Sequence, residues 1–185
     1  MATLAAMRRL LLGGLVAATL AVAAPAHAGG PSMVVGAAED AVKQDNVAGA
    51  KAKLDLLKLA GFRAVRITST WAPALRAPVA SEQQRLDSLA SAAQMDGIVV
   101  YVQVMNFGSK TTPLTTQQQN DFAAYAATIV RKDPSFQNVI VGNEPNNNRF
   151  WLPQFGLDGS DVAAASYEAL LATTYDALKA VSPDV

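Results

Sequence analysis

Short apolar runs rich in β-branched residues alternate along the chain with longer stretches whose apolar residues recur every three or four positions. The short runs predict four strands, at 34–37, 64–68, 98–104 and 138–142. The longer stretches predict four helices: 47–60, one from Ser81 to Gly97, one from Thr115 through Ile129, and one over about 161–180. Gly61 and Gly97 have the position of helix-ending glycines, and Ser81 with Gln84 and Thr115 with Gln118 have capping-box spacing.

This β-α-β-α-β-α-β-α order favours a parallel sheet with right-handed crossovers. Two α/β architectures contain four such units: an open doubly wound sheet, and the first half of a TIM (β/α)8 barrel. A complete barrel needs roughly 200 residues or more. The run 98–104 is almost continuously apolar, so we expect that strand to be buried on both faces. Periodicity leaves both architectures open, and the residues at the strand ends must decide between them.

The first 28 residues have the three-part layout of a secretory signal peptide. Arg8 and Arg9 give the positive start, residues 10–24 are apolar and uncharged, and Ala26-His27-Ala28 is a small-x-small cleavage site. The apolar run is shorter than the roughly 20 residues that span a bilayer. We therefore expect residues 1–28 to be removed and residues 29–185 to be secreted; the alternative is an uncleaved membrane anchor.

Charge and composition restrict the chemistry of residues 29–185. They contain 13 basic and 15 acidic residues, which suggests neither a nucleic-acid partner nor stable membrane association. Cysteine is absent and the sole histidine, His27, lies in the signal peptide. Thiol nucleophiles, Ser-His-Asp triads and His- or Cys-based zinc sites are thereby excluded from this segment. Carboxylates remain for acid/base work.

Glu144 directly follows the fourth predicted strand, at the strand end where α/β proteins hold their active sites. Pro145 stiffens the turn after it, and Asn143 offers an amide to a substrate hydroxyl. This Asn-Glu-Pro motif resembles clan A glycoside hydrolases, in particular the cellulase-like family 5, whose fourth strand ends in the same three residues. The resemblance implies a catalytic barrel in which Glu144 is the acid/base and Asn143 binds the sugar 2-hydroxyl.

The stretch 61–67, Gly-Phe-Arg-Ala-Val-Arg-Ile, resembles the second strand of the same family, which ends in an arginine that reaches the active site. Arg66 stands among apolar residues, where an unpaired guanidinium is costly to bury. In the resembling enzymes its partner is the nucleophilic glutamate, which the arginine keeps ionised. The alternatives are that Arg66 reaches solvent or pairs with Asp96.

Three further residues are candidates for binding sugar. Trp71 and Trp151 follow the second and fourth strands, and an indole face buries the apolar side of a pyranose well. The alternative is that both tryptophans are ordinary packing residues. Asn106, at the end of the third strand, is a weaker polar candidate. Glu39 and Asp40 follow the first strand, where they either contact substrate or cap the next helix.

Retaining glycosidases need a second carboxylate about 5 to 5.5 Å from the first. Of the other glutamates, Glu82 and Glu168 fall within predicted helices, and the family's nucleophile comes from a seventh strand that this sequence lacks. We therefore expect the N-terminal half of a secreted, retaining glycosidase acting on a β-linked glycan, without metal or organic cofactor, and a missing C-terminal half as partner. The alternatives are a non-catalytic carbohydrate-binding remnant and a small doubly wound domain with an unrelated ligand.

Overall fold

The computed structural model describes residue 30 and residues 32–185. The predicted signal peptide therefore lies outside the described residues. Within them no helix is both long and apolar enough to cross a membrane. Residues 34–185 form one compact unit. Its elements are β1 (Gly36–Ala38), η1 (Asp40–Val42), α2 (Val47–Leu59), β2 (Ala64–Trp71), α3 (Ala80–Asp96), β3 (Val99–Asn106), η2 (Ser109–Thr111), α4 (Thr116–Lys132), β4 (Asn138–Val141) and α5 (Val162–Val181).

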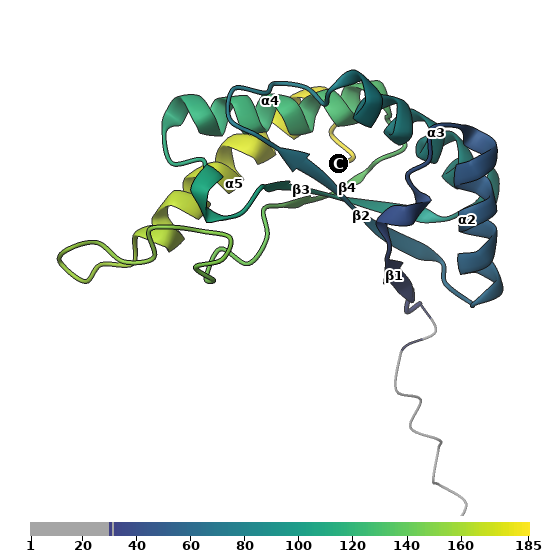
Figure 1. The fold of residues 1–185 in the computed structure, drawn as a ribbon, viewed down its shortest axis with the longest axis horizontal. Coiled ribbons are helices and arrows are strands. Elements are labelled where there is room, and N and C mark those ends of the chain that lie inside the picture. Colours follow the sequence, from purple (N-terminus) through teal and green to yellow (C-terminus); the bar gives the residue numbers. More distant parts are fainter. Residues whose placement is uncertain (1–29, 31) are drawn as a thin grey trace, which may run out of the picture. The chain divides into compact units, whose positions relative to one another are not determined.

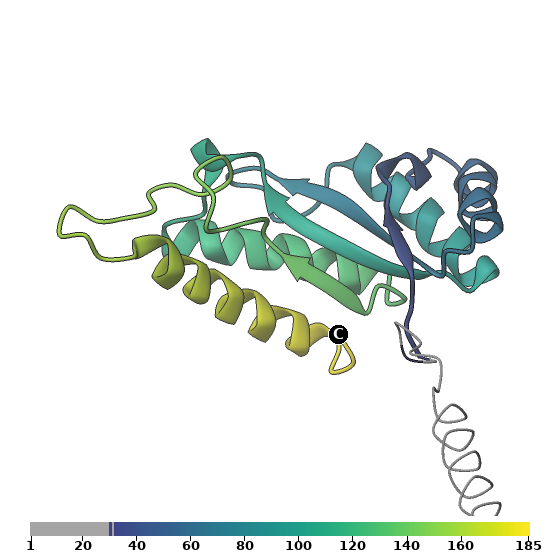
Figure 2. The ribbon, with the colours of Figure 1, turned by 90° about the horizontal axis from the view of Figure 1, so that it is seen from below.

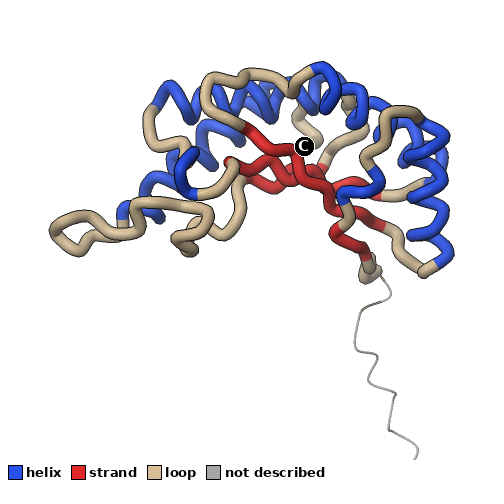
Figure 3. Tube along the Cα trace, viewed as in Figure 1, coloured by secondary structure: helices blue, strands red, loops and turns tan. Residues whose placement is uncertain are grey.

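The four strands form one parallel sheet in the order β1-β2-β3-β4. Helices α2 to α5 all cover the same face of this sheet (Figures 1 and 3). A doubly wound domain would carry helices on both faces. The one-sided arrangement is that of a barrel segment, whose other face would line the barrel interior.

The burial of the strand residues follows this one-sided cover. Val65 and Ile67 of β2 point toward the helices and are fully buried, whereas Arg66 between them is exposed. The expectation that β3 is buried on both faces is wrong for the described residues. Val99 is 40% exposed and Tyr101 36% exposed, because they lie on the face that no helix covers. The apolar core fills the space between sheet and helices, with Phe122, Tyr125 and Ile129 of α4 among its largest members.

Most of the predicted helix boundaries are confirmed. Thr115 and Gln118 form both hydrogen bonds of a capping box at the start of α4. Gly61, at φ 90°, follows α2, and Gly97, at φ 64°, caps α3 in the left-handed conformation that glycine adopts without strain. The capping role predicted for Ser81 is wrong. The N-cap of α3 is Val79, without a side-chain cap bond, so Ser81 already lies inside the helix.

Candidate active site

Glu144 lies just beyond the carboxyl end of β4, on a sharply turned backbone. Gly142 has φ 74° and Glu144 has φ 39°, a left-handed conformation that is uncommon for a residue with a side chain. The Glu144 backbone oxygen accepts a hydrogen bond from Asn147 N–H at 2.9 Å. Its side-chain Oε2 accepts from Asn147 Nδ2 at 3.0 Å. The turn thus presents an exposed carboxylate with one amide donor already beside it.

Gln103, which the sequence analysis did not single out, joins β2, β3 and the Glu144 turn. It is only 3% exposed although it lies on the face of β3 opposite the helices. Its Oε1 accepts a hydrogen bond from Arg66 Nη1. Its Nε2 donates to the Gly142 backbone oxygen at 2.9 Å and to Asn143 Oδ1 at 3.0 Å. A single amide within the otherwise apolar run 98–105 was the signal available in the sequence.

The pairing of Arg66 with a nucleophilic glutamate of a seventh strand stays a prediction, because no such strand is among the described residues. In the described part of the chain the Arg66 side chain bonds the neutral amide of Gln103 and no carboxylate. The alternative pairing with Asp96 is wrong, because Asp96 instead binds Lys51 at 2.9 Å and Lys58 at 3.6 Å. The guanidinium is exposed on the uncovered face of the sheet, as the solvent-reaching alternative required.

The two tryptophans have no exposed face in this structure. Trp71 is 0% exposed, stacks edge-on against Phe122 and donates its indole N–H to the Leu75 backbone oxygen at 2.8 Å. Trp151 is also 0% exposed, packs against Tyr167 and donates to Ser166 Oγ at 2.9 Å. The prediction that they offer stacking platforms is corrected for this reason. Trp71 lies on the helix-facing side of β2, and Trp151 anchors its loop to α5.

Asn106 is a buried structural residue and does not face a cleft, so its predicted role in binding sugar is corrected. It is 1% exposed, and its Nδ2 donates to the backbone oxygens of Gly108 at 2.8 Å and Phe150 at 2.9 Å. These two bonds tie the loop after β3 to the loop after β4. Asn106 Oδ1 is buried without a partner among the described residues.

The side chains of the remaining acidic candidates already have partners. Glu39 accepts from Ala41 N–H at 2.8 Å, and Asp40 accepts from Thr68 N–H at 2.6 Å. Glu39 thus fulfils the capping alternative as the N-cap of η1, whereas Asp40 ties η1 to β2. Glu82 is paired with Lys43 at 2.8 Å. The described residues contain no group of three or more acidic, histidine or cysteine side chains that could hold a metal ion.

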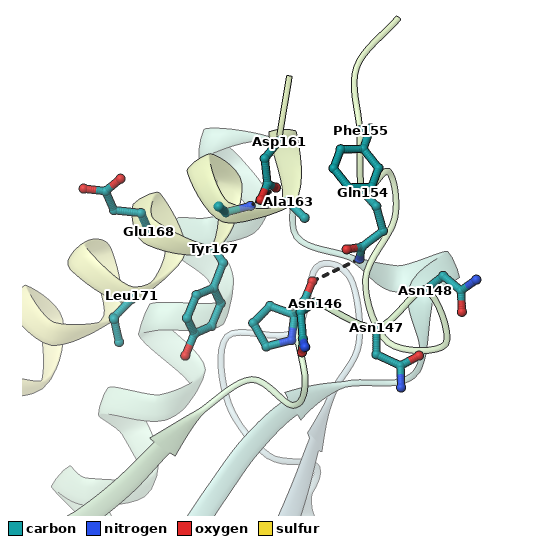
Figure 4. A pocket seen from close by; sticks show the side chains of 12 residues that line it. Asn146, Asn147, Asn148, Gln154, Phe155, Asp161, Ala163, Tyr167, Glu168 and Leu171 are labelled. Carbon is teal, nitrogen blue, oxygen red and sulfur yellow. Dashed lines mark hydrogen bonds between the residues drawn. The ribbon is translucent and has the colours of Figure 1, made fainter. Parts of the chain in front are cut away.

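A cavity of about 780 Å³ lies between the loop after β4 and the start of α5 (Figure 4). Its polar wall is the run Asn146 to Asn148 and Gln154, and its apolar wall includes Phe155, Tyr167 and Leu171. The Gln154 amide donates to the Pro145 backbone oxygen at 3.0 Å and holds the two sides of the loop together. Glu144, Asn143 and Arg66 do not line this cavity. Asn143 and Arg66 both hydrogen-bond Gln103, which lies on the uncovered face of the sheet.

Comparison with known structures identifies the architecture. The chain is similar to a GH5-4 broad-specificity endoglucanase from Clostridium longisporum, with a TM-score of 0.54 and 15% sequence identity. The match covers 80% of this chain and 50% of that chain. The fold is half of a TIM barrel. No sequence-family model and no curated protein matches the chain.

The half-barrel prediction is thus confirmed, and the doubly wound alternative is wrong. The chain spans about half the length of the endoglucanase it matches. At 15% identity the likeness concerns the fold, and the chemistry must be argued from the residues themselves.

Proposed function

We propose that this half-barrel belongs to a secreted, retaining glycoside hydrolase of the family 5 type, which cleaves a β-linked glycan with Glu144 as its acid/base. The observation that carries the proposal is the position and conformation of Glu144. An exposed carboxylate stands in a left-handed turn at the carboxyl end of the fourth strand of a half-barrel. Strained backbone at such a position is a common feature of functional sites.

The neighbouring groups suit glycosidic chemistry. Glu144 would protonate the leaving oxygen and later take a proton from water. Asn143 offers amide hydrogens beside it, because its oxygen is already occupied by Gln103. Arg66 adds a cation on the same uncovered face, where it would favour the ionised form of a nucleophilic carboxylate.

The second carboxylate would come from the missing C-terminal half. Glu39 caps η1, Asp40 accepts from the Thr68 N–H of β2, and Glu82 is paired with Lys43. Glu168 lies on α5, in the wall of the cavity that Glu144 does not line. Acid/base and nucleophile would then be brought within about 5 to 5.5 Å only in the completed barrel.

One substitution tests the role of Glu144. In a longer chain that includes the missing strands, Glu144→Gln should leave the thermal unfolding profile and glycan binding unchanged. It should lower turnover of aryl β-glycosides with poor leaving groups by roughly 10² to 10⁴, the usual share of general acid catalysis. Glu168→Gln is the matched control and should turn over normally. Near-normal activity of Glu144→Gln would exclude Glu144 as the acid/base.

The lack of a suitably placed second carboxylate among the described residues favours a second candidate, a carbohydrate-binding module without turnover. Residues 29–185 should be titrated with cellotetraose, mannotetraose and xylotetraose by calorimetry and assayed in parallel on aryl β-glycosides. Binding with no turnover, even in the longer chain, would support the binding module. Turnover by residues 29–185 alone would mean that Glu39, Asp40 or another acid of this segment serves as the second carboxylate.

A further inference from the structure

We propose that Gln103 is a positioning residue that, held by Arg66, fixes which way the Asn143 side-chain amide faces, an inference that rests on the proposed function. The three side chains form one hydrogen-bonded chain from β2 through β3 to the Glu144 turn. Each hydrogen bond in this chain has a donor and an acceptor, and the bond from Arg66 to Gln103 determines which group donates in the next one.

Arg66 sets the direction because a guanidinium has donors and no acceptor. Gln103 must therefore turn its oxygen toward Arg66 and its NH2 group toward β4. That NH2 group donates to Asn143 Oδ1 at 3.0 Å, so the oxygen of Asn143 points inward. The Asn143 NH2 group is left facing outward, as a donor to an acceptor atom of a bound ligand.

Burial keeps this order from being reversed. Gln103 is 3% exposed, so water has little access to re-pair a rotated amide. The same Nε2 donates to the Gly142 backbone oxygen at 2.9 Å, at the residue with φ 74° two positions before Glu144. A rotated Gln103 would place its oxygen against the Gly142 backbone oxygen and its NH2 group against Arg66. These two groups therefore favour the same orientation of Gln103, independently of Asn143.

The orientation has a consequence for ligand recognition. A donor NH2 beside Glu144 suits the lone pairs of a sugar hydroxyl or a carboxylate, whereas the amide oxygen would suit neither a carboxylate nor a hydroxyl whose proton is already donated elsewhere. Gln103 and Arg66 would thus influence glycan binding without Gln103 touching the glycan.

The experiment uses 15N-labelled residues 29–185 at a concentration where the protein is monomeric by chromatography. In the wild type the Gln103 side-chain NH2 should be protected from exchange and the Asn143 NH2 should exchange rapidly. In Gln103→Glu the carboxylate only accepts, so the Asn143 amide should turn and its NH2 should become protected. Loss of the Asn143 signals in Asn143→Asp gives their assignment.

Two further variants separate orientation from general damage. Gln119→Glu places a carboxylate at another buried glutamine, 8% exposed, whose amide donates to the Ser166 backbone oxygen in another part of the fold. It should leave the Asn143 signals unchanged. Arg66→Met removes the donor that sets the direction from an exposed position, and should lower the exchange protection of the Gln103 NH2 at least tenfold.

Glycan binding provides the second readout. If cellotetraose binds, Gln103→Glu and Gln103→Met should weaken it tenfold or more, and Gln119→Glu by less than threefold. If no glycan binds the wild type, the proposed function loses its support while the amide signals still test the role of Gln103. Unchanged Asn143 signals in Gln103→Glu would overturn the inference. If Gln103→Glu does not fold, unchanged signals in both Gln103→Met and Arg66→Met would overturn it equally.

Discussion

Glu144 and Ala74 are the residues other than glycine with positive φ in the part of the chain that the structure describes, at 39° and 71°. For a residue with a Cβ this region costs on the order of 1–2 kcal/mol relative to the right-handed conformation. The turn at Glu144 is retained nevertheless, because Asn147 binds both its backbone oxygen and its side chain, and Gly142 precedes it. The strained turn lowers local stability and at the same time presents the Glu144 carboxylate to solvent.

The backbone strain at Glu144 can be measured. Glu144→Gly should be more stable than Glu144→Ala, because glycine adopts positive φ without a Cβ clash. The expected difference in the free energy of unfolding, measured by urea denaturation, is about 1 kcal/mol. Glu168, inside α5, is the matched position and should give the opposite order, with glycine about 1 kcal/mol less stable than alanine. The same order at both positions would show that Glu144 does not hold this conformation in solution.

At the scale of the elements, the carboxylates of Asp87 and Asp133 share a contact with Gln83 where α3 packs beside the end of α4. Gln83 of α3 donates to Asp87 at 2.6 Å and to Asp133 at 3.2 Å. Burial, and then the charge of Asp87, raise the pKa of Asp133 to about 7, while Gln83 and Lys132 act in the opposite direction. The native state therefore holds a proton on Asp133 at pH values where the unfolded chain has lost it.

The sign of the pH dependence follows from this proton. The contribution of Asp133 to stability is complete below pH 4 and is lost as the pH rises from about 4 toward 7. Asp133→Asn should thus gain stability relative to the wild type as the pH rises from 4 to 8, in urea unfolding monitored by circular dichroism. Asp87→Asn should lower the pKa of Asp133, because one cause of the raised value is removed. The loss of stability should then be complete at a lower pH than in the wild type. Parallel profiles for wild type and Asp133→Asn would contradict the shift.

At the scale of the whole molecule, the helices leave one face of the sheet uncovered, and one side of β4 has no strand partner within the described residues (Figure 2). The Gly142 N–H donates to the Val104 backbone oxygen of β3. Because alternate residues of a parallel strand direct their backbone N–H and C=O groups to the same neighbour, those of Ile140 face β3 and those of Val139 face the free side. A cavity of about 330 Å³ runs along this free side of β4, bounded by Leu171, Tyr175 and Val185. Such an apolar edge pairs readily with other strands.

We expect residues 29–185 alone to self-associate through this edge in a concentration-dependent manner. Val139→Pro should reduce the association seen in sedimentation velocity while leaving the fold intact, because the lost N–H faces the free side. Ile140→Pro is the matched control and should destabilise the fold, since its N–H belongs to the ladder with β3. Association of Val139→Pro equal to that of the wild type would show that β4 is not the contact.

The sequence by itself determined the order of elements, the parallel sheet and the place of Glu144. These features depend on local signals: apolar periodicity for strands and helices, Gly97 as a helix end, Thr115 with Gln118 as a capping box. Glu144 was predictable because it follows a strand directly, and the connection leaves it little freedom to lie elsewhere. The half-barrel could be preferred only through the resemblance of its motifs, since four β-α units alone fit either architecture.

Tertiary structure decided which side chains meet and which are buried. Trp71 and Trp151 look alike in the sequence whether they bind sugar or fill the core, and only the packing of Trp71 against Phe122 and of Trp151 against Tyr167 shows them buried. Arg66 and Gln103 are 37 residues apart and meet only through the pairing of β2 with β3. Hydrogen bonds and burial depend on neighbours distant in sequence, and a single chain's residue pattern carries no record of those distances.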